Sequence, residues 1–148
     1  MSVHEFKTAS AEETIACGRE LAKLLMPPTV LILRGDLGAG KTTLVKGIAE
    51  ALDAADADEV TSPTFTLIHE YEGVWDGRPV RLYHLDLYRI ESERELAALG
   101  LDDLAAADSL VLVEWGEKFA SLVGRSDGEI VLESEGEDSR KITLRLKA

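Results

Sequence analysis

Apolar residues recur along this chain with two different spacings, and segments of the two kinds follow one another. Alternating or continuous apolar runs predict strands near residues 4–7, 29–33, the later part of 60–71, 80–87, 110–113, 128–133 and 140–146. Apolar residues at helical spacing predict helices from 11 to about 25 and from 43 to about 52. Strands and helices in this order are typical of an α/β fold in which helices cover both faces of a sheet.

Residues at the ends of these segments support the boundaries. The stretches 10–13 and 92–95 both read Ser-x-x-Glu, the spacing of a capping box at the start of a helix. Pro27-Pro28 is expected to stop the first helix, and Gly100 is expected at the end of the helix that begins near 92. Asp76-Gly77 is a strong signal for a tight hairpin turn.

The segment Gly35–Thr42 has the pattern GxxxxGK[ST] of a phosphate-binding loop. It lies between a predicted strand and a predicted helix, which is the context that this motif requires; an accidental glycine-rich turn is the alternative. The glycines allow backbone N–H groups to surround a phosphate, while Lys41 reaches the terminal phosphates and the Thr42 hydroxyl binds Mg²⁺. The residues expected to hold the nucleotide are Asp36, Leu37, Gly38, Ala39, Gly40, Lys41, Thr42 and Thr43.

These elements define the predicted architecture. The continuous apolar run Leu110–Val113 is typical of a central parallel strand that is buried on both faces. Segments 128–133 and 140–146 alternate apolar and polar residues on either side of an acidic turn, which predicts an antiparallel hairpin. We therefore expect residues 1–148 to form one domain. Its fold is predicted to be a three-layer α/β P-loop NTPase fold with a mixed, mostly parallel central sheet and a C-terminal antiparallel hairpin.

Phosphoryl transfer from ATP also needs acidic residues at strand ends, and two candidates are present. Asp86 ends one predicted strand and Glu114 follows another. Ligands of open α/β sheets bind at the carboxyl ends of the strands, where both acids are expected. A solvated carboxylate is the alternative for either residue alone. The spacing leaves open which acid contacts Mg²⁺ and which orients the attacking water.

Four other residues are candidates for contacts with the nucleotide or its metal. Thr64 follows the P-loop helix in a loop where its hydroxyl can bind Mg²⁺ while a γ-phosphate is present. Thr61 and Ser62 compete for that role, and an ordinary β-turn at Ser62 is the alternative. Trp115, next to Glu114, is expected either in the core or against a nucleotide or a partner.

Composition and charge limit the classes of function. The 148 residues are 45% hydrophobic and 30% charged, as in ordinary globular proteins, and no apolar run is long enough to span a membrane. The N-terminus lacks the order of a signal peptide, so a cytoplasmic protein is expected. The net charge of −12 argues against this chain alone holding RNA, which requires a basic surface. The three histidines lack metal-ligand spacing, so zinc is not expected; Cys17, the single cysteine, is expected in the core.

Four blocks occur together and resemble one family. They are Gly35–Thr43, Ser62–Leu67, His84–Arg89 and Val113–Trp115. In this order they resemble the TsaE family, formerly YjeE, of bacterial ATPases in tRNA threonylcarbamoyladenosine biosynthesis. The similarity extends from about Leu31 to the terminal hairpin. Val123–Arg125 departs from the Leu-Pro expected before that hairpin.

The resemblance implies a Mg²⁺-dependent ATPase that assists the TsaB–TsaD complex and is not itself the transferase. It implies that ATP hydrolysis resets the complex between turnovers, and that the partners hold the tRNA. Lys41 and Thr42 match the residues that bind phosphate and Mg²⁺, and Asp86 matches the Walker-B-like acid. Thr64 matches a switch-like position, while Glu114-Trp115 matches a pair near the nucleotide.

Two other functions remain open at this point. The chain is alternatively a nucleotide-sensing module whose ATP form docks a partner without needing hydrolysis. A small metabolite kinase is the third possibility, although such enzymes carry an arginine-rich lid and the arginines here are scattered. Arg89 and Arg125 are candidates for charge-stabilising fingers, with surface ion pairs as the alternative. The Asn-Lys-x-Asp signature of guanine-binding GTPases is absent, so adenine is expected.

Overall fold

The computed structural model describes residues 1–36, 38–56, 59–61 and 67–147. The described residues include one seven-stranded sheet with the strand order β1-β7-β6-β2-β5-β4-β3. The strands are β1 (Ser2–Thr8), β2 (Thr29–Arg34), β3 (Ile68–Trp75), β4 (Arg78–Asp86), β5 (Ser109–Glu114), β6 (Gly128–Ser134) and β7 (Arg140–Leu146). All seven strand regions predicted from the sequence are therefore confirmed, with bounds that differ by a few residues.

The sheet is mixed, and most of its strands share one direction. Strands β6, β2, β5 and β4 form consecutive parallel pairs. Strand β7 is antiparallel to both β6 and β1, and β3 is antiparallel to β4. Only β3 and β7 thus run against the other described strands, which confirms the mostly parallel sheet and the C-terminal hairpin. The position of β1 beside that hairpin was not predicted.

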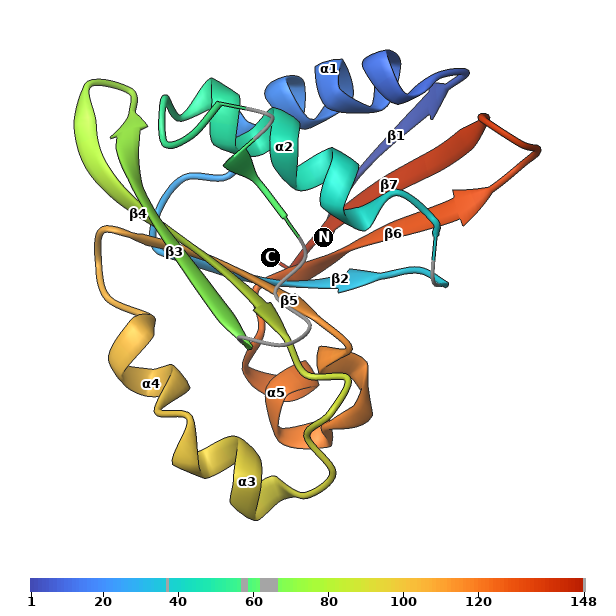
Figure 1. The fold of residues 1–148 in the computed structure, drawn as a ribbon. Coiled ribbons are helices and arrows are strands. Elements are labelled where there is room, and N and C mark those ends of the chain that lie inside the picture. The colour runs from blue at the N-terminus through green and yellow to red at the C-terminus, as the bar shows by residue number, and fades with distance from the viewer. Residues whose placement is uncertain (37, 57–58, 62–66, 148) are drawn as a thin grey trace.

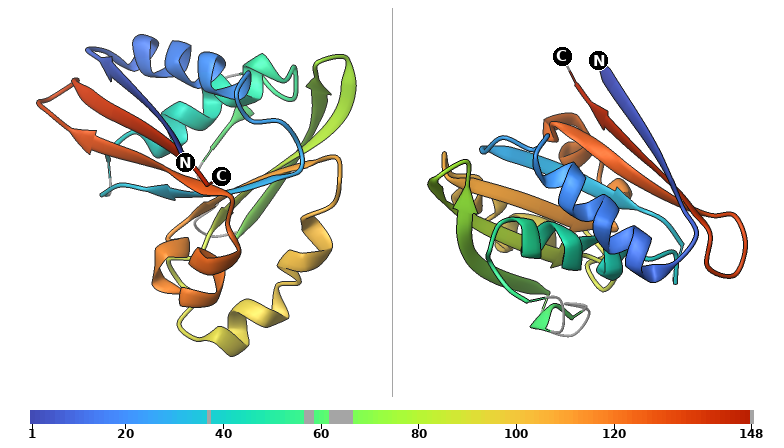
Figure 2. Two further views of the ribbon diagram at one scale, coloured as in Figure 1. Left: turned by 180° about the vertical axis from the view of Figure 1, so that it is seen from behind. Right: turned by 90° about the horizontal axis from the view of Figure 1, so that it is seen from above.

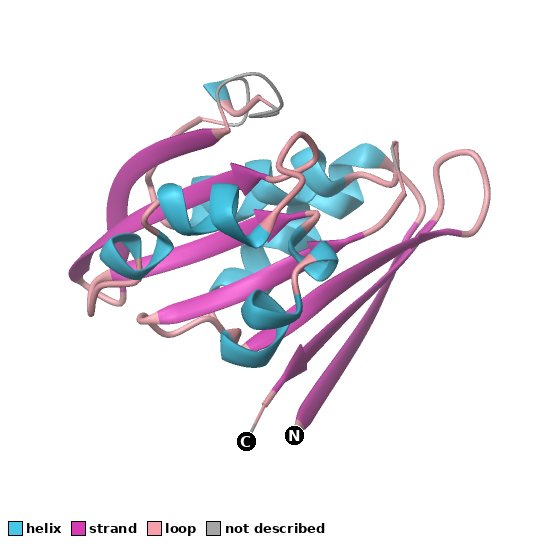
Figure 3. Cartoon of the chain, turned by 90° about the horizontal axis from the view of Figure 1, so that it is seen from below, coloured by secondary structure: helices cyan, strands magenta, loops and turns pink. Residues whose placement is uncertain are grey.

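Helices cover both faces of the sheet (Figure 1 and Figure 2). Helices α1 (Ala11–Ala22) and α2 (Lys41–Ala51) lie on one face. The shorter helices α3 (Glu93–Ala98), α4 (Leu101–Leu104) and α5 (Ala120–Arg125) lie on the other, together with the 3-10 helix η2 (Gly116–Lys118). Each face has its own cluster of buried apolar side chains, so the fold has the predicted three layers. Figure 3 shows the sheet between these helices.

The first helix begins as predicted but ends earlier. The backbone N–H of Glu13 donates to the Ser10 hydroxyl, and the Glu13 carboxylate accepts from Ala9 N–H, so the capping box forms. The helix ends at Ala22 rather than near Leu25. Leu25 is nevertheless buried, because a turn after the helix carries its side chain into the core. The apolar pattern therefore extends beyond the helix itself.

Helices α1 and α2 approach each other closely through two glycines. A Cβ added at Gly47 would lie 1.9 Å from the backbone oxygen of Ile15, and one added at Gly18 would lie 2.3 Å from that of Leu44. Cys17, beside Gly18, belongs to the core as predicted. Burial, assisted by the nearby Glu20 carboxylate, raises the pKa of the Cys17 thiol to about 11. The glycine contact fixes α2, and therefore the start of α2, against the rest of the fold.

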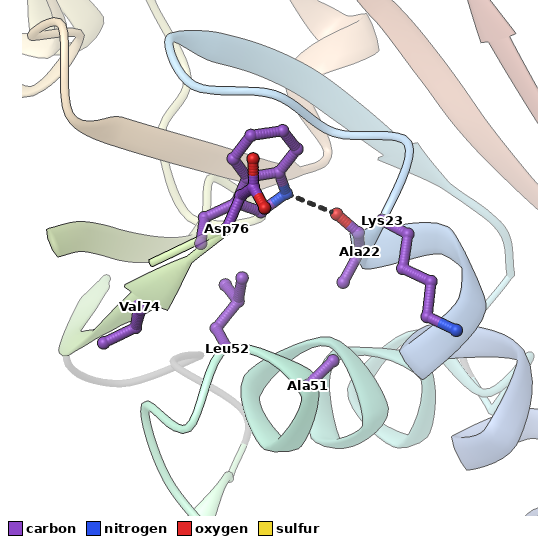
Figure 4. A pocket seen from close by; sticks show the side chains of 7 residues that line it. Ala22, Lys23, Ala51, Leu52, Val74 and Asp76 are labelled. Carbon is purple, nitrogen blue, oxygen red and sulfur yellow. Dashed lines mark hydrogen bonds between the residues drawn. The ribbon is translucent and has the colours of Figure 1, made fainter. Parts of the chain in front are cut away.

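The β3–β4 hairpin is tied to the same layer at the far end of α2. Its two turn residues, Asp76 and Gly77, both have positive φ angles, as the predicted Asp-Gly turn requires. The indole N–H of Trp75 donates to the backbone oxygen of Ala22 over 2.8 Å (Figure 4). A cavity of about 390 Å³ lies beside this bond and is lined by Ala22, Lys23, Ala51, Leu52, Val74, Trp75 and Asp76. Because Ala51 ends α2, this cavity is remote from the P-loop at the start of that helix.

The described part of the chain contains no helix that is both long enough and apolar enough to cross a membrane.

Candidate nucleotide-binding site

The P-loop connects the end of β2 to the first residue of α2. Gly38 and Gly40 have φ angles of +79° and +100°, which glycine adopts at little cost. Gly40 is the N-cap of α2, so the free N–H groups and the positive dipole end of that helix face the loop. Thr42 and Thr43 occupy the first turn of α2 and are half-buried. Leu37 lies outside the described residues, while the described part of the loop has the form of an anion site.

Lys41 lies at the centre of the site and is only 6% exposed. Its Nζ donates to the backbone oxygen of Gly35 over 2.7 Å. The same nitrogen lies 3.6 Å from Glu114 Oε1 and 4.5 Å from the centroid of the Trp115 ring. The ammonium group therefore links the P-loop to the end of β5.

The two predicted acids, Asp86 and Glu114, lie side by side at the carboxyl ends of β4 and β5. They occupy paired positions in the parallel ladder, and each is 4% exposed. Glu114 is on the strand next to the P-loop strand, which explains its contact with Lys41. Asp86 is one strand further away, and its Oδ1 accepts from the backbone N–H of Tyr88 over 2.9 Å. The sequence-based placement of both acids at the ends of their strands is confirmed.

His84 belongs to this cluster, although the sequence search for metal ligands set it aside. The ring is fully buried, and its Nε2 lies 2.6 Å from Glu114 Oε2. His84 and Asp86 are two residues apart on β4, so both side chains point to the same face of the sheet. That alternation, together with the place of His84 in the His84–Arg89 block, is the sequence signal that points to this residue. The role of His84 was not predicted, because its spacing from the other histidines does not suit a metal site.

An aromatic pair forms the outer edge of the site. Trp115 is half-buried, has a φ of +66°, and packs against the buried apolar cluster on the α3–α5 face. Its ring lies 5.3 Å from that of Tyr88, which is 53% exposed. Lys118 supports the Tyr88 segment, because its Nζ donates to the backbone oxygens of Leu87, Tyr88 and Ile90. The core expectation for Trp115 is therefore confirmed, and its ring also lies against the P-loop lysine, while a contact with a nucleotide or a partner stays a prediction.

Arg140, at the start of β7, connects the terminal hairpin to the P-loop. Its Nε donates to the backbone oxygen of Ala39 over 2.9 Å, and its Nη2 donates to that of Gly38 over 3.3 Å. Its Nη1 donates to backbone oxygens of the hairpin loop, at Gly136, Glu137 and Ser139. One guanidinium group thus links two loops that are about a hundred residues apart. Arg140 belongs to none of the motifs recognised in the sequence.

A cleft of about 590 Å³ lies against the P-loop. It is lined by Arg34, Gly35, Asp36, Gly38, Ala39, Trp115, Glu117, Val131, Leu132, Glu133 and Ser134. The carboxyl ends of β2 and β6 form part of its wall, as expected for a ligand site in an open α/β sheet. The cleft therefore lies at the same edge of the sheet as Lys41 and the two acids.

The remaining candidates lie in different places. Ser62 and Thr64 fall outside the described residues, and Thr61 is exposed just before them. Arg125 forms an ion pair with Asp102 on the other face of the sheet, in agreement with the surface-pair alternative. Arg89 follows Tyr88 in a turn after β4.

The described side chains include no cluster of three or more His, Cys, Asp or Glu residues able to hold a metal alone. Mg²⁺ at nucleotide sites takes one or two carboxylates together with phosphate oxygens and waters. The Thr42 hydroxyl and the paired carboxylates of Asp86 and Glu114 fit that need without a protein-only cage.

The family model for the threonylcarbamoyl adenosine biosynthesis protein TsaE matches residues 8–142. The chain belongs to the TsaE family. A TsaE protein of Bacillus subtilis is 42% identical over 140 residues, covering 95% of this chain and 84% of the relative. The TsaE protein of Treponema pallidum is 36% identical and is covered over 95% of its length.

The structural comparison agrees with this assignment. The crystal structure of Bacillus subtilis YdiB superposes with a TM-score of 0.73 at 35% identity, covering 99% of this chain and 87% of that one. The family and the P-loop fold predicted from the sequence are both confirmed. The TsaE match begins at residue 8, so it also includes α1, upstream of the region where the sequence motifs first indicated the resemblance.

Proposed function

We propose that this TsaE-family chain is an ATP-binding and ATP-hydrolysing subunit for tRNA threonylcarbamoyladenosine biosynthesis. The observation that carries the proposal is the position of the P-loop residue Lys41 beside the buried Glu114 carboxylate, which pairs with Asp86, in a chain whose relatives are named for that pathway. A lysine held beside a P-loop supplies a positive charge to the terminal phosphates. Acids at the ends of β4 and β5 supply the groups that a nucleotide-bound cation requires.

Each residue of the site has a part in the proposed chemistry, and Glu114 has two. The P-loop N–H groups and Lys41 bind and orient the phosphates, and the Thr42 hydroxyl and the paired acids hold Mg²⁺. Bound Mg²⁺ neutralises charge on the β- and γ-phosphates. Glu114, whose Oε1 lies 3.6 Å from Lys41 Nζ, is also proposed to accept a hydrogen bond from the attacking water. Trp115 excludes solvent from the lysine side, and Thr64 is proposed as a further Mg²⁺ ligand.

The proposed partners are TsaB and TsaD, acting in the cytoplasm. The net charge of −12 disfavours direct binding of tRNA, so the tRNA is proposed to bind the partners instead. The chain is proposed to support repeated turnover of the TsaB–TsaD complex rather than to transfer the threonylcarbamoyl group. The test is multiple-turnover modification of tRNA by TsaB and TsaD with Mg-ATP, with and without this chain. Equal turnover in both reactions would contradict the proposal.

The alternative is a nucleotide-sensing module that docks a partner without needing hydrolysis. Its support is the exposed Tyr88 ring, which packs at a tilt against Trp115, the ring that lies against Lys41. The affinity of a partner that binds at Tyr88 would therefore depend on the orientation of the Lys41 side chain.

The Glu114→Ala variant distinguishes the two functions. We expect ATP binding to be retained and hydrolysis to fall about a hundredfold or more, because the group that orients the water is gone. We also expect multiple-turnover tRNA modification to be lost. The measurements are phosphate release and modified tRNA per TsaD molecule. Many turnovers without hydrolysis would favour the sensing module.

The Arg140→Ala variant tests the link between the hairpin and the P-loop. We expect affinity for ATP analogues to fall about tenfold, because the carbonyls of Gly38 and Ala39 lose charge-assisted hydrogen bonds that hold the loop. Arg145→Ala is the matched control, since Arg145 is on the same strand but pairs with Glu129. Titration with a fluorescent ATP analogue measures both variants. Equal affinities would show that the P-loop holds its shape without Arg140.

A further inference from the structure

We propose that His84 is a positioning residue for Glu114. In this proposal the Nε2–H group of His84 holds one carboxylate oxygen of Glu114, so that the other oxygen faces Lys41 and the nucleotide. The proposal rests on the proposed ATPase function, and it assigns a role to a residue that the phosphate-binding motif does not include.

The geometry holds the Glu114 carboxylate at both of its oxygens. Oε2 lies 2.6 Å from His84 Nε2, and Oε1 lies 3.6 Å from Lys41 Nζ. His84 is fully buried and Glu114 is 4% exposed. Water therefore has little access to replace either contact. The carboxylate is oriented by one partner from β4 and one from the P-loop.

Lys41 and His84 differ in whether their side chains must move when a nucleotide binds. Lys41 donates to Gly35 O in this structure and must turn toward the phosphates to bind them. That movement weakens its contact with Glu114. His84 lies within β4, in register with Leu112 of β5, and its ring has no room to follow. His84 therefore keeps Glu114 in place at the step when Lys41 leaves it.

The hydrogen-bonding pattern of the ring gives the direction of this bond. An ionised carboxylate only accepts, so Nε2 must carry the hydrogen. Nδ1 is buried and has no hydrogen-bond partner among the residues that the structure describes. The bond to Glu114 is thus the single polar contact of the ring in that part of the chain. A buried ring with one polar contact, made to an active-site acid, points to positioning rather than to general packing.

His84→Leu and His84→Gln test the proposal as a pair. The leucine removes the donor while filling similar space, whereas the glutamine amide can donate from a similar position. We expect His84→Leu to bind ATP within about threefold of wild type and to lower kcat about 10- to 100-fold, the range seen for residues that orient metal ligands. We expect His84→Gln to recover most of the loss. A normal kcat in His84→Leu, or no recovery in a folded His84→Gln, would overturn the proposal.

His69→Leu is the matched control. His69 lies opposite His84 on β3 and contacts the Tyr71 hydroxyl rather than an acid of the site. It should leave kcat and KM unchanged. A second comparison combines His84→Leu with Glu114→Ala. If His84 acts through Glu114, the double variant is no slower than Glu114→Ala alone, whereas additive losses would show an independent role.

An NMR measurement reads the bond without hydrolysis. Long-range ¹H–¹⁵N spectra of the wild-type chain should show the His84 ring protonated at Nε2, with a resonance that shifts in Glu114→Ala and not in His69→Leu. Protonation at Nδ1 alone would overturn the proposal. If the wild-type chain shows this signature but hydrolyses no ATP with TsaB and TsaD present, the ATPase function fails while the His84–Glu114 bond stands.

Discussion

The Lys41→Ala variant is expected to lose Mg-ATP-dependent stimulation of tRNA modification completely. The lysine supplies the positive charge for the terminal phosphates, and charge-assisted hydrogen bonds of this kind contribute about 3 kcal/mol, or roughly a hundredfold in affinity. A second effect adds to the first. Without the ammonium group, the buried Glu114 carboxylate loses its neighbouring cation and repels the phosphates directly.

Two measurements check this expectation. Titration with an ATP analogue reports the loss of affinity, and modified tRNA per TsaD molecule reports the loss of turnover. Lys46→Ala is the matched control, because Lys46 is on the same helix but belongs to neither the P-loop nor its carboxylate cluster. Thermal unfolding should show that both variants remain folded. Wild-type turnover by Lys41→Ala would mean that the P-loop does not carry the function.

The local parts of the site were predictable because their signals are local. The P-loop motif, the capping box at Ser10 and the Asp-Gly turn each depend on a few neighbouring residues, and all three form as predicted. The pairing of Asp86 with Glu114 could also be expected, since both end strands of the same sheet. In a parallel sheet, residues that end neighbouring strands lie at the same edge, so their proximity can be predicted from their positions in the sequence.

The contacts that were missed depend on distant parts of the chain. Arg140 donates to the backbone oxygen of Ala39, which is 101 residues away in the sequence. No pattern in a single sequence indicates that these two residues are in contact. His84 contacts Glu114, an acid on another strand, and no spacing within the sequence indicates that contact. The order of the strands in the sheet could not be predicted either. Nothing near Ser2–Thr8 shows that it pairs with β7 rather than with β2. In each case tertiary packing, and not local propensity, decides the outcome.

The Gly47→Ala variant is expected to destabilise the fold strongly, although alanine favours helices. The new Cβ would lie 1.9 Å from the Ile15 backbone oxygen and 3.0 Å from the Gly18 Cα, so α1 and α2 would have to separate. Overpacking of this kind costs about 3 kcal/mol, and the gain in helix propensity returns about 1 kcal/mol. We expect a net loss of about 2 kcal/mol, or roughly 4 to 8 °C in Tm for a chain of this size.

Gly124→Ala is the matched control for this prediction. Gly124 also lies in a helix, α5, but nothing lies within 4 Å of a Cβ added there. Alanine should therefore be neutral or raise the free energy of unfolding by about 0.5–1 kcal/mol. Thermal and urea unfolding of both variants separate a helix-propensity effect from a packing effect. If Gly47→Ala were as stable as Gly124→Ala, the close approach of α1 and α2 would not be what positions the helix that begins at Lys41.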